Sequence, residues 1–121
     1  MKQGFFSEHW VDENGNPAGG VTIGKGFTIS WQNGPLGQEE DRLEPNGAFV
    51  EDVIEAAINR IEVYQDSEFA CTENAMALGN LKLALKALEL RTKRRTQEGT
   101  EGTHIKSDSE GRVLPNSDGY A

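Results

Sequence analysis

The longest regular pattern of apolar and polar positions runs from Phe69 to Gly99. Strong helix formers dominate this stretch, no proline interrupts it, and a glycine ends it. When its residues are placed at steps of ~100° around a helix, the polar ones collect mainly in one narrow sector and most of the rest is apolar. A surface helix needs an apolar stripe of only ~100° or a little more. The pattern therefore predicts one long helix over about residues 68–98 that must be covered from several sides.

A second helical pattern precedes it, over about residues 48–65. Acidic residues occupy one side of this helix and apolar residues the other, with Arg60 on the apolar side. Asn46 is placed to cap this helix, and Ser67 to cap the long one. Only residues 66–68 connect the two patterns, and helices joined so briefly must fold back on each other as an antiparallel hairpin.

The N-terminal part of the chain has the pattern of strands. Residues 5–12 are aromatic, residues 21–32 bring β-branched and aromatic residues in near alternation, and residues 13–20 between them are rich in turn formers. An antiparallel ribbon over about residues 5–32 follows, packed on the helices because two strands alone are marginal. Gly24, Lys25 and Gly26 lack the spacing of a phosphate-binding loop and predict a bulge or close backbone approach within the second strand.

These elements define an α+β fold, in which a small N-terminal antiparallel β-sheet packs on a C-terminal antiparallel two-helix hairpin. One domain is expected over residues 1–105, with a loop at 33–47 and a polar tail at 106–121. Both helices carry apolar arcs wider than a two-helix contact can bury. The chain is therefore expected to oligomerise through its helices, with a dimer as the minimum.

The charge distribution narrows the class of ligand. The 121-residue chain has a net charge of −8, which argues against a general nucleic-acid binder. Yet six of its twelve Lys and Arg residues lie between Lys82 and Arg95. Such a local cluster suits a small anionic ligand or an acidic partner surface, and it also suits the macrodipole at a helix C-terminus.

Candidate chemistry is sparse. A single cysteine excludes an intrachain disulfide, and two distant histidines do not make a zinc site, so no metal or cofactor is expected. Cys71 is expected to be a small buried residue. No nucleophile has a plausible base beside it, which argues against an enzyme. No apolar run reaches the ~20 residues that cross a bilayer, and a cytoplasmic protein is expected.

One set of residues does suggest a binding site: Tyr64, Asn74 and Arg91. A tyrosine ring, an amide and a guanidinium are the groups that stack on a base, read its edge and fork onto phosphate. Asn74 and Arg91 are about 25 Å apart on one helix, at 1.5 Å per residue, so only a two-fold partner can bring them to one small ligand. A core tyrosine and polar groups satisfied by packing remain the alternative.

Three runs of the sequence carry a resemblance to a known family. They are GKGFTISWQNGPLG, EDRLEPNGAFVEDVIEAAINRIEVYQ and FACTENAMALGNLKLALKALELRTKRRTQEGTEGTH. Together they resemble the phage Thoeris anti-defence sponge family, over about residues 20–105. The helical hairpin of that family is shared with phage proteins that sequester the cyclic oligonucleotides of CBASS defence.

The resemblance implies a function and a site. Members of the family bind cyclic ADP-ribose isomers, including glycocyclic ADP-ribose, in two pockets at a dimer interface and do not cleave them. Some are hexamers of three dimers that also bind cyclic trinucleotides at separate sites. The family's aromatic, asparagine and arginine positions fall here on Tyr64, Asn74 and Arg91. The segment associated with the trinucleotide site falls on Arg95, Thr103 and His104.

If the resemblance holds, the protein acts in the cytoplasm of the infected bacterial host as a stoichiometric sponge. Two other functions stay open on the sequence. One is an oligomeric protein-interaction module that docks a host or phage protein through the apolar arcs and the basic helix end. The other is an enzyme that hydrolyses the signal.

Overall fold

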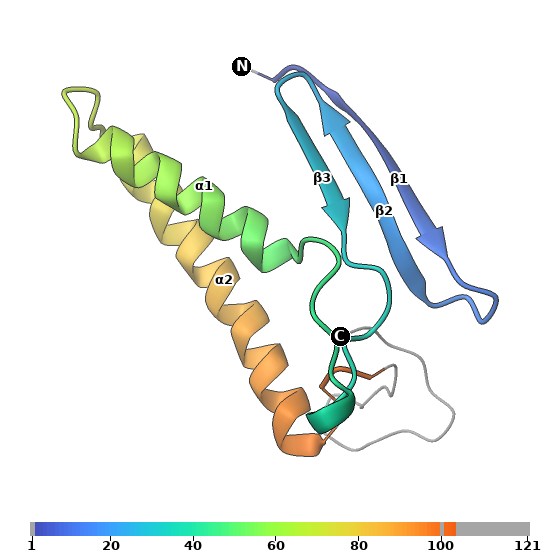
Figure 1. Ribbon diagram of the computed structural model, residues 1–121. Coiled ribbons are helices and arrows are strands. Elements are labelled where there is room, and N and C mark those ends of the chain that lie inside the picture. Colours follow the sequence, from blue (N-terminus) through green and yellow to red (C-terminus); the bar gives the residue numbers. More distant parts are fainter. Residues whose placement is uncertain (1, 100, 104–121) are drawn as a thin grey trace. The chain divides into compact units, whose positions relative to one another are not determined.

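The computed structural model describes residues 2–99 and 101–103 (Figure 1). Its elements, in chain order, are β1 (Phe5–Val11), β2 (Pro17–Gly24), β3 (Phe27–Trp31), the short 3-10 helix η1 (Glu39–Asp41), α1 (Val50–Gln65) and α2 (Thr72–Glu98). The chain divides into two compact units. Residues 49–91 form one, and residues 2–48 together with residues 92–99 and 101–103 form the other. An antiparallel sheet followed by a two-helix hairpin confirms the predicted α+β class.

The sheet has three antiparallel strands in the order β1-β2-β3, so the prediction of a two-stranded ribbon is wrong. What reads as one strand over residues 21–32 is broken at Lys25 and Gly26, which form the turn of a hairpin whose last pair is Gly24 and Phe27. Gly26 has a φ of 91°, a left-handed value that other residues rarely adopt. The glycines therefore mark a turn here, not a bulge.

The second strand also begins earlier than predicted, at Pro17. The turn before it is held by the Asp12 carboxylate, which accepts hydrogen bonds from the backbone N–H groups of Asn14 and Asn16 at 2.8 and 3.0 Å. A Cβ on Gly20 would lie 2.3 Å from the Glu8 carbonyl oxygen of β1. Gly20 therefore allows the backbones of β1 and β2 to approach closely. The glycines and proline at the start of β2 have the composition of a turn, but they belong to a strand.

Hydrogen bonds between Asn33 and Asn46 hold together the two ends of the loop that joins β3 to α1. The Asn46 side chain accepts a hydrogen bond from the backbone N–H of Asn33 at 2.8 Å and donates one to the Asn33 carbonyl at 3.0 Å. Asn46 therefore does not cap α1, contrary to the prediction. The Asp52 carboxylate instead accepts from the backbone N–H of Phe49 at 2.8 Å, so the helix is capped from inside its first turn.

A polar clasp, formed by Gln38, Arg42 and Glu101, ties this loop to the chain just after α2. The Gln38 side-chain amide donates to the carbonyls of Gly99 and Glu101 at 2.7 and 3.0 Å. Arg42 donates through both terminal nitrogens to the Glu101 carboxylate, with Nη2 to Oε1 at 2.7 Å. These residues are about sixty positions apart in sequence, so the clasp is a tertiary contact that fixes where the chain leaves α2.

The backbones of the two clasped segments also touch. The backbone N–H of Gly37 donates to the Gly102 carbonyl at 2.8 Å. Gly102 has a φ of 78°, and a Cβ there would lie 2.1 Å from the Gly37 carbonyl oxygen. Because Leu36 is buried beside this contact, the loop and the helix end pack as one piece.

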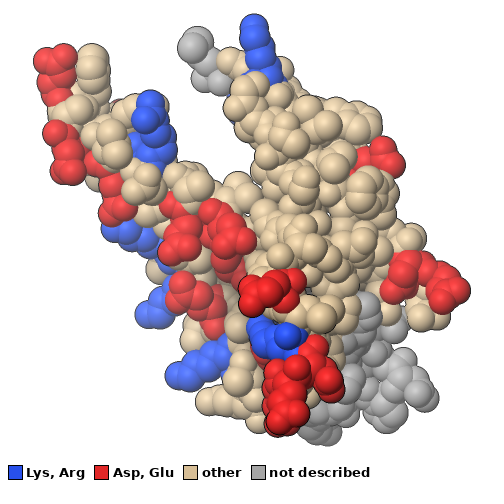
Figure 2. Space-filling model, viewed as in Figure 1, with Lys and Arg blue, Asp and Glu red and all other residues tan. Residues whose placement is uncertain are grey.

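The helices leave much apolar surface uncovered. Among the described residues only two apolar side chains are buried, Leu36 and Ile58. Large apolar side chains of the hairpin are exposed, and on the face in view of Figure 2 charged residues of both signs lie along the helices whereas the sheet is largely uncharged. The described part of the chain contains no helix long and apolar enough to cross a membrane. Oligomerisation through the helices stays a prediction.

The clasp should respond to pH. The hydrogen bond from Arg42, more than its charge, holds the pKa of Glu101 below its ordinary value, against a smaller opposing effect of burial. A carboxylate with a lowered pKa adds stability above its unfolded pKa of about 4.3 and loses it as the pH falls through the folded value.

We therefore expect Glu101→Gln to weaken the clasp at neutral pH and to have progressively less effect as the pH falls through the lowered pKa of Glu101. Because the ion pair is partly exposed, the loss is about 1 kcal/mol or less. That corresponds to a decrease of up to ~5-fold in the hydrogen-exchange protection of the Gly37 amide, measured by NMR in both proteins across this pH range. A difference between parent and variant that does not shrink with falling pH would contradict the assignment.

Candidate functional site

The turn between α1 and α2 is held by side chains at its base. The Gln65 amide bonds both backbone groups of Cys71: its Oε1 accepts from the N–H at 3.0 Å and its Nε2 donates to the carbonyl at 3.1 Å. Ser67 donates through Oγ to the Tyr64 carbonyl at 2.6 Å and accepts from the Phe69 N–H at 3.1 Å. Ser67 thus closes the turn. The prediction that it caps the long helix is wrong, because α2 begins later, at Thr72.

Tyr64 lies in the last turn of α1 with its side chain 41% exposed. One turn earlier, Arg60 donates through Nε to the Tyr64 hydroxyl at 3.1 Å, and its Cζ lies 4.9 Å from the ring centroid. Arg60 thus lies on the side of the helix that carries Tyr64, as the sequence predicts, but it is exposed and covers the tyrosine ring. A signal for this contact was present in the sequence, since residues four apart share a helix face.

Asn74 lies at the start of α2, across the turn from Tyr64, and is half-buried. Both residues are therefore at the same end of the hairpin. Cys71 is exposed, contrary to the prediction that it is buried, because it belongs to the connection before α2 and not to a packed helix face.

Arg91 lies toward the other end of α2 and is half-buried. The helix is continuous from Thr72 to Glu98, so Asn74 and Arg91 are about 25 Å apart along its axis. One chain therefore brings Tyr64 and Asn74 to one end of the hairpin and leaves Arg91 far from them.

One turn of α2 beyond Arg91, the structure brings Arg95 and Thr103 together. Arg95 is only 3% exposed, and its Nη2 donates to the Thr103 carbonyl at 2.9 Å. Glu98, with 10% of its side chain exposed, lies 4.0 Å from Arg94 Nη1. His104, predicted beside Arg95 and Thr103, lies outside the described residues.

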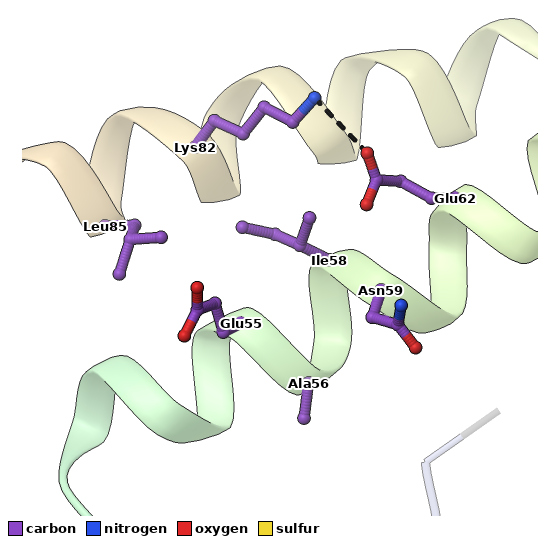
Figure 3. Close-up of a pocket in the computed structure, with 7 residues that line it drawn as sticks. All are labelled: Glu55, Ala56, Ile58, Asn59, Glu62, Lys82 and Leu85. Atoms are coloured by element: carbon purple, nitrogen blue, oxygen red, sulfur yellow. Dashed lines mark ion pairs between the residues drawn. The ribbon is translucent and has the colours of Figure 1, made fainter.

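A groove of ≈ 620 Å³ opens between α1 and α2 (Figure 3). Its apolar lining residues are Ala56, Ile58 and Leu85, and Lys82 Nζ lies 3.7 Å from Glu62 Oε2. None of the predicted site residues lines it. Because its other charged residue, Glu55, is also acidic, the groove does not favour an anionic ligand.

Sequence reasoning missed the residues of the clasp, Gln38, Arg42 and Glu101, which border a hollow of ≈ 270 Å³ beside the end of α2. No local pattern marks them, because their partners are distant in sequence. Within the described residues no group of three or more His, Cys, Asp or Glu side chains is arranged to hold a metal ion.

Much of the chain is similar to known proteins. Residues 25–93 match the family described as Acb2/Tad1, hairpin domain. The chain is also 45% identical over 83 residues to a protein named Thoeris anti-defense 1, from Bacillus phage SBSphiJ7. The match covers 69% of this chain and 56% of that protein, so this chain spans little more than half of its relative's length.

The two hydrogen bonds from the Gln65 side chain to the Cys71 backbone, here called the clamp, should stabilise the turn. Gln65→Ala deletes both hydrogen bonds to the Cys71 backbone, so we expect the free energy of unfolding to fall by about 1–2 kcal/mol. Urea denaturation at a fixed protein concentration measures this. Gln97→Ala, at an exposed position of α2, is the matched control and should change stability by about 0.5 kcal/mol or less. Equal stability of the two variants would show that the clamp contributes nothing.

Proposed function

Because this chain belongs to the Acb2/Tad1 hairpin domain family, we propose that it is a phage anti-defence protein that captures a bacterial immune signal. The proposed ligands are cyclic ADP-ribose isomers, such as glycocyclic ADP-ribose, which signal in Thoeris immunity. They are bound in the cytoplasm of the infected host and are not cleaved. The observation that carries the proposal is the arrangement of the hairpin, with Tyr64 and Asn74 at one end and Arg91 toward the other.

Each of these side chains suits one part of such a ligand. The partly exposed Tyr64 ring can stack on adenine, the Asn74 amide can read the edge of the base, and the Arg91 guanidinium can fork onto the pyrophosphate. Nanomolar capture requires about 12 kcal/mol. Stacking contributes ~1–3 kcal/mol and a charge-assisted hydrogen bond ~1.5–3 kcal/mol. The remainder has to come from enclosure in a preorganised pocket.

A second copy of the chain would supply that enclosure. Met76, Leu83 and Leu90 are 62, 67 and 56% exposed on α2. They are spaced one heptad apart, which places them along one seam of the helix. An apolar seam of this kind supports pairing with another helix.

The position of the seam also fits a shared pocket. Leu83 is its midpoint, and Asn74 lies nine residues before Leu83 while Arg91 lies eight after it. If two copies of α2 pair antiparallel about Leu83, Arg91 of the partner subunit comes level with Asn74. Two equivalent pockets would result, one at each end of the paired helices.

The same proposal extends to a second site. Arg95, Thr103 and His104 would bind cyclic trinucleotides of CBASS between dimers, in an assembly of three dimers. The hydrogen bond from Arg95 to the Thr103 carbonyl supports placing these two residues in one location.

The ligand is identified by capture and release. Purified protein is mixed separately with cyclic ADP-ribose isomers and with cyclic trinucleotides, filtered free of unbound nucleotide, heated, and the released material is identified by mass spectrometry. Unchanged nucleotide is expected. Release of a linear product would instead indicate an enzyme, and no retained nucleotide would favour a protein-interaction module.

Point variants test the pocket. We expect Tyr64→Ala, Asn74→Ala and Arg91→Ala each to weaken capture by about 10- to 100-fold, since each removes one stacking or charge-assisted contact. Lys93→Ala removes a cation close to Arg91 but on the polar sector of α2, and it should bind as the parent does. Isothermal titration gives the dissociation constants. Parent-like affinity in the three pocket variants would overturn the site assignment.

A charge introduced at Leu83, the midpoint of the seam, tests the proposed dimer. Leu83→Glu places a charge on the seam, so we expect monomers by light scattering and loss of capture in the same sample. Lys93→Glu introduces the same side chain on the polar sector and should keep the parent's mass. A Leu83→Glu variant that stays oligomeric and retains the nucleotide would contradict the shared pocket.

A further inference from the structure

We infer that Arg60 is a further ligand-binding residue, which holds the Tyr64 ring in place and contacts the phosphate of the nucleotide stacked on it. The inference rests on the proposed function and adds to it a cation from the same chain as Tyr64. The observation behind it is the pair of contacts between Arg60 and Tyr64, one to the hydroxyl and one over the ring.

Those two contacts fix the ring. The hydrogen bond from Nε to the hydroxyl restrains one end of the side chain, and the guanidinium 4.9 Å from the centroid covers one face. The Tyr64 carbonyl is held in turn by Ser67 Oγ at 2.6 Å. A ring restrained at both the backbone and the hydroxyl loses little conformational entropy when a base stacks on its other face.

Arg60 keeps donors available for an anion. A guanidinium carries five N–H donors, and the hydrogen bond to Tyr64 uses only the one on Nε. Among the described residues, no ion pair ties Arg60 to an acidic side chain. Its two terminal nitrogens are therefore placed beside an aromatic ring, where they can fork onto a phosphate.

Arg60 provides a positive charge in an otherwise acidic stretch of the sequence. It is the only Lys or Arg between Leu43 and Leu81, and that stretch contains eight Asp and Glu residues. The charged residues nearest to Tyr64 in the sequence, Glu62, Asp66 and Glu68, would repel an anionic nucleotide, whereas this guanidinium would attract it. Arg91 of the partner subunit adds its charge only after two chains have paired, whereas Arg60 acts within each chain.

The test is the affinity for the captured cyclic ADP-ribose isomer, measured by isothermal titration at several salt concentrations. We expect Arg60→Gln to weaken binding by about 10- to 100-fold and to make the dissociation constant less dependent on salt, because one cation is lost from the site. Arg60→Lys keeps the charge and should recover part of the loss. Tyr64→Phe keeps the ring and should bind within about 3-fold of the parent.

Controls separate a binding role from a structural one. Lys82→Gln removes a cation from the groove between α1 and α2, which Tyr64 does not line, and should leave affinity and salt dependence unchanged. All variants are compared with the parent for circular dichroism and for mass by light scattering. A purely structural Arg60 would change stability without changing the salt dependence.

The outcomes are distinct. If the parent binds the nucleotide and Arg60→Gln binds it equally well with the same salt dependence, the inference about Arg60 is wrong and the proposed function stands. If the parent binds no cyclic nucleotide, the proposed function fails and this inference fails with it.

Discussion

The proposed function depends on apolar surface that one copy of the chain leaves uncovered. α2 is a continuous helix of 27 residues, and the side chains at its heptad positions Met76, Leu83 and Leu90 are more than half exposed. Burying a large apolar side chain contributes roughly 1.5–3 kcal/mol, so this seam is a strong reason for two copies to pair. The same helix separates the candidate ligand-binding groups by about 25 Å, which one chain cannot close. In the proposed function, the length of this one helix therefore makes ligand capture depend on assembly.

Local polar contacts hold the two ends of that helix in different ways. At the start, Gln65 and Ser67 close a short turn through hydrogen bonds between near neighbours in sequence. At the end, Arg42 and Glu101 join segments that are far apart in sequence. The first arrangement positions Tyr64 and Asn74 relative to each other. The second fixes the exit of the chain close to the buried Arg95.

The acidic character of the chain makes its few cations informative. Arg60 is alone among acidic residues and lies over an aromatic ring, whereas Arg95 is enclosed and bonded to a backbone carbonyl. A family name cannot distinguish these roles. The distinction rests on what each guanidinium contacts, and under the proposed function Arg60 would be an anion-binding group that belongs to the hairpin turn of a single chain.

The sequence by itself determined the two helices, their antiparallel connection and the distance from Asn74 to Arg91, because helical periodicity and a fixed rise per residue are local properties. It also indicated a strand-rich N-terminus but not its division. Only the tertiary structure decided that Lys25 and Gly26 turn the chain and that Gly20 allows two strands to approach. The same holds for the clasp and for the burial of Arg95. These features depend on pairing between distant segments, which no local pattern of residues encodes.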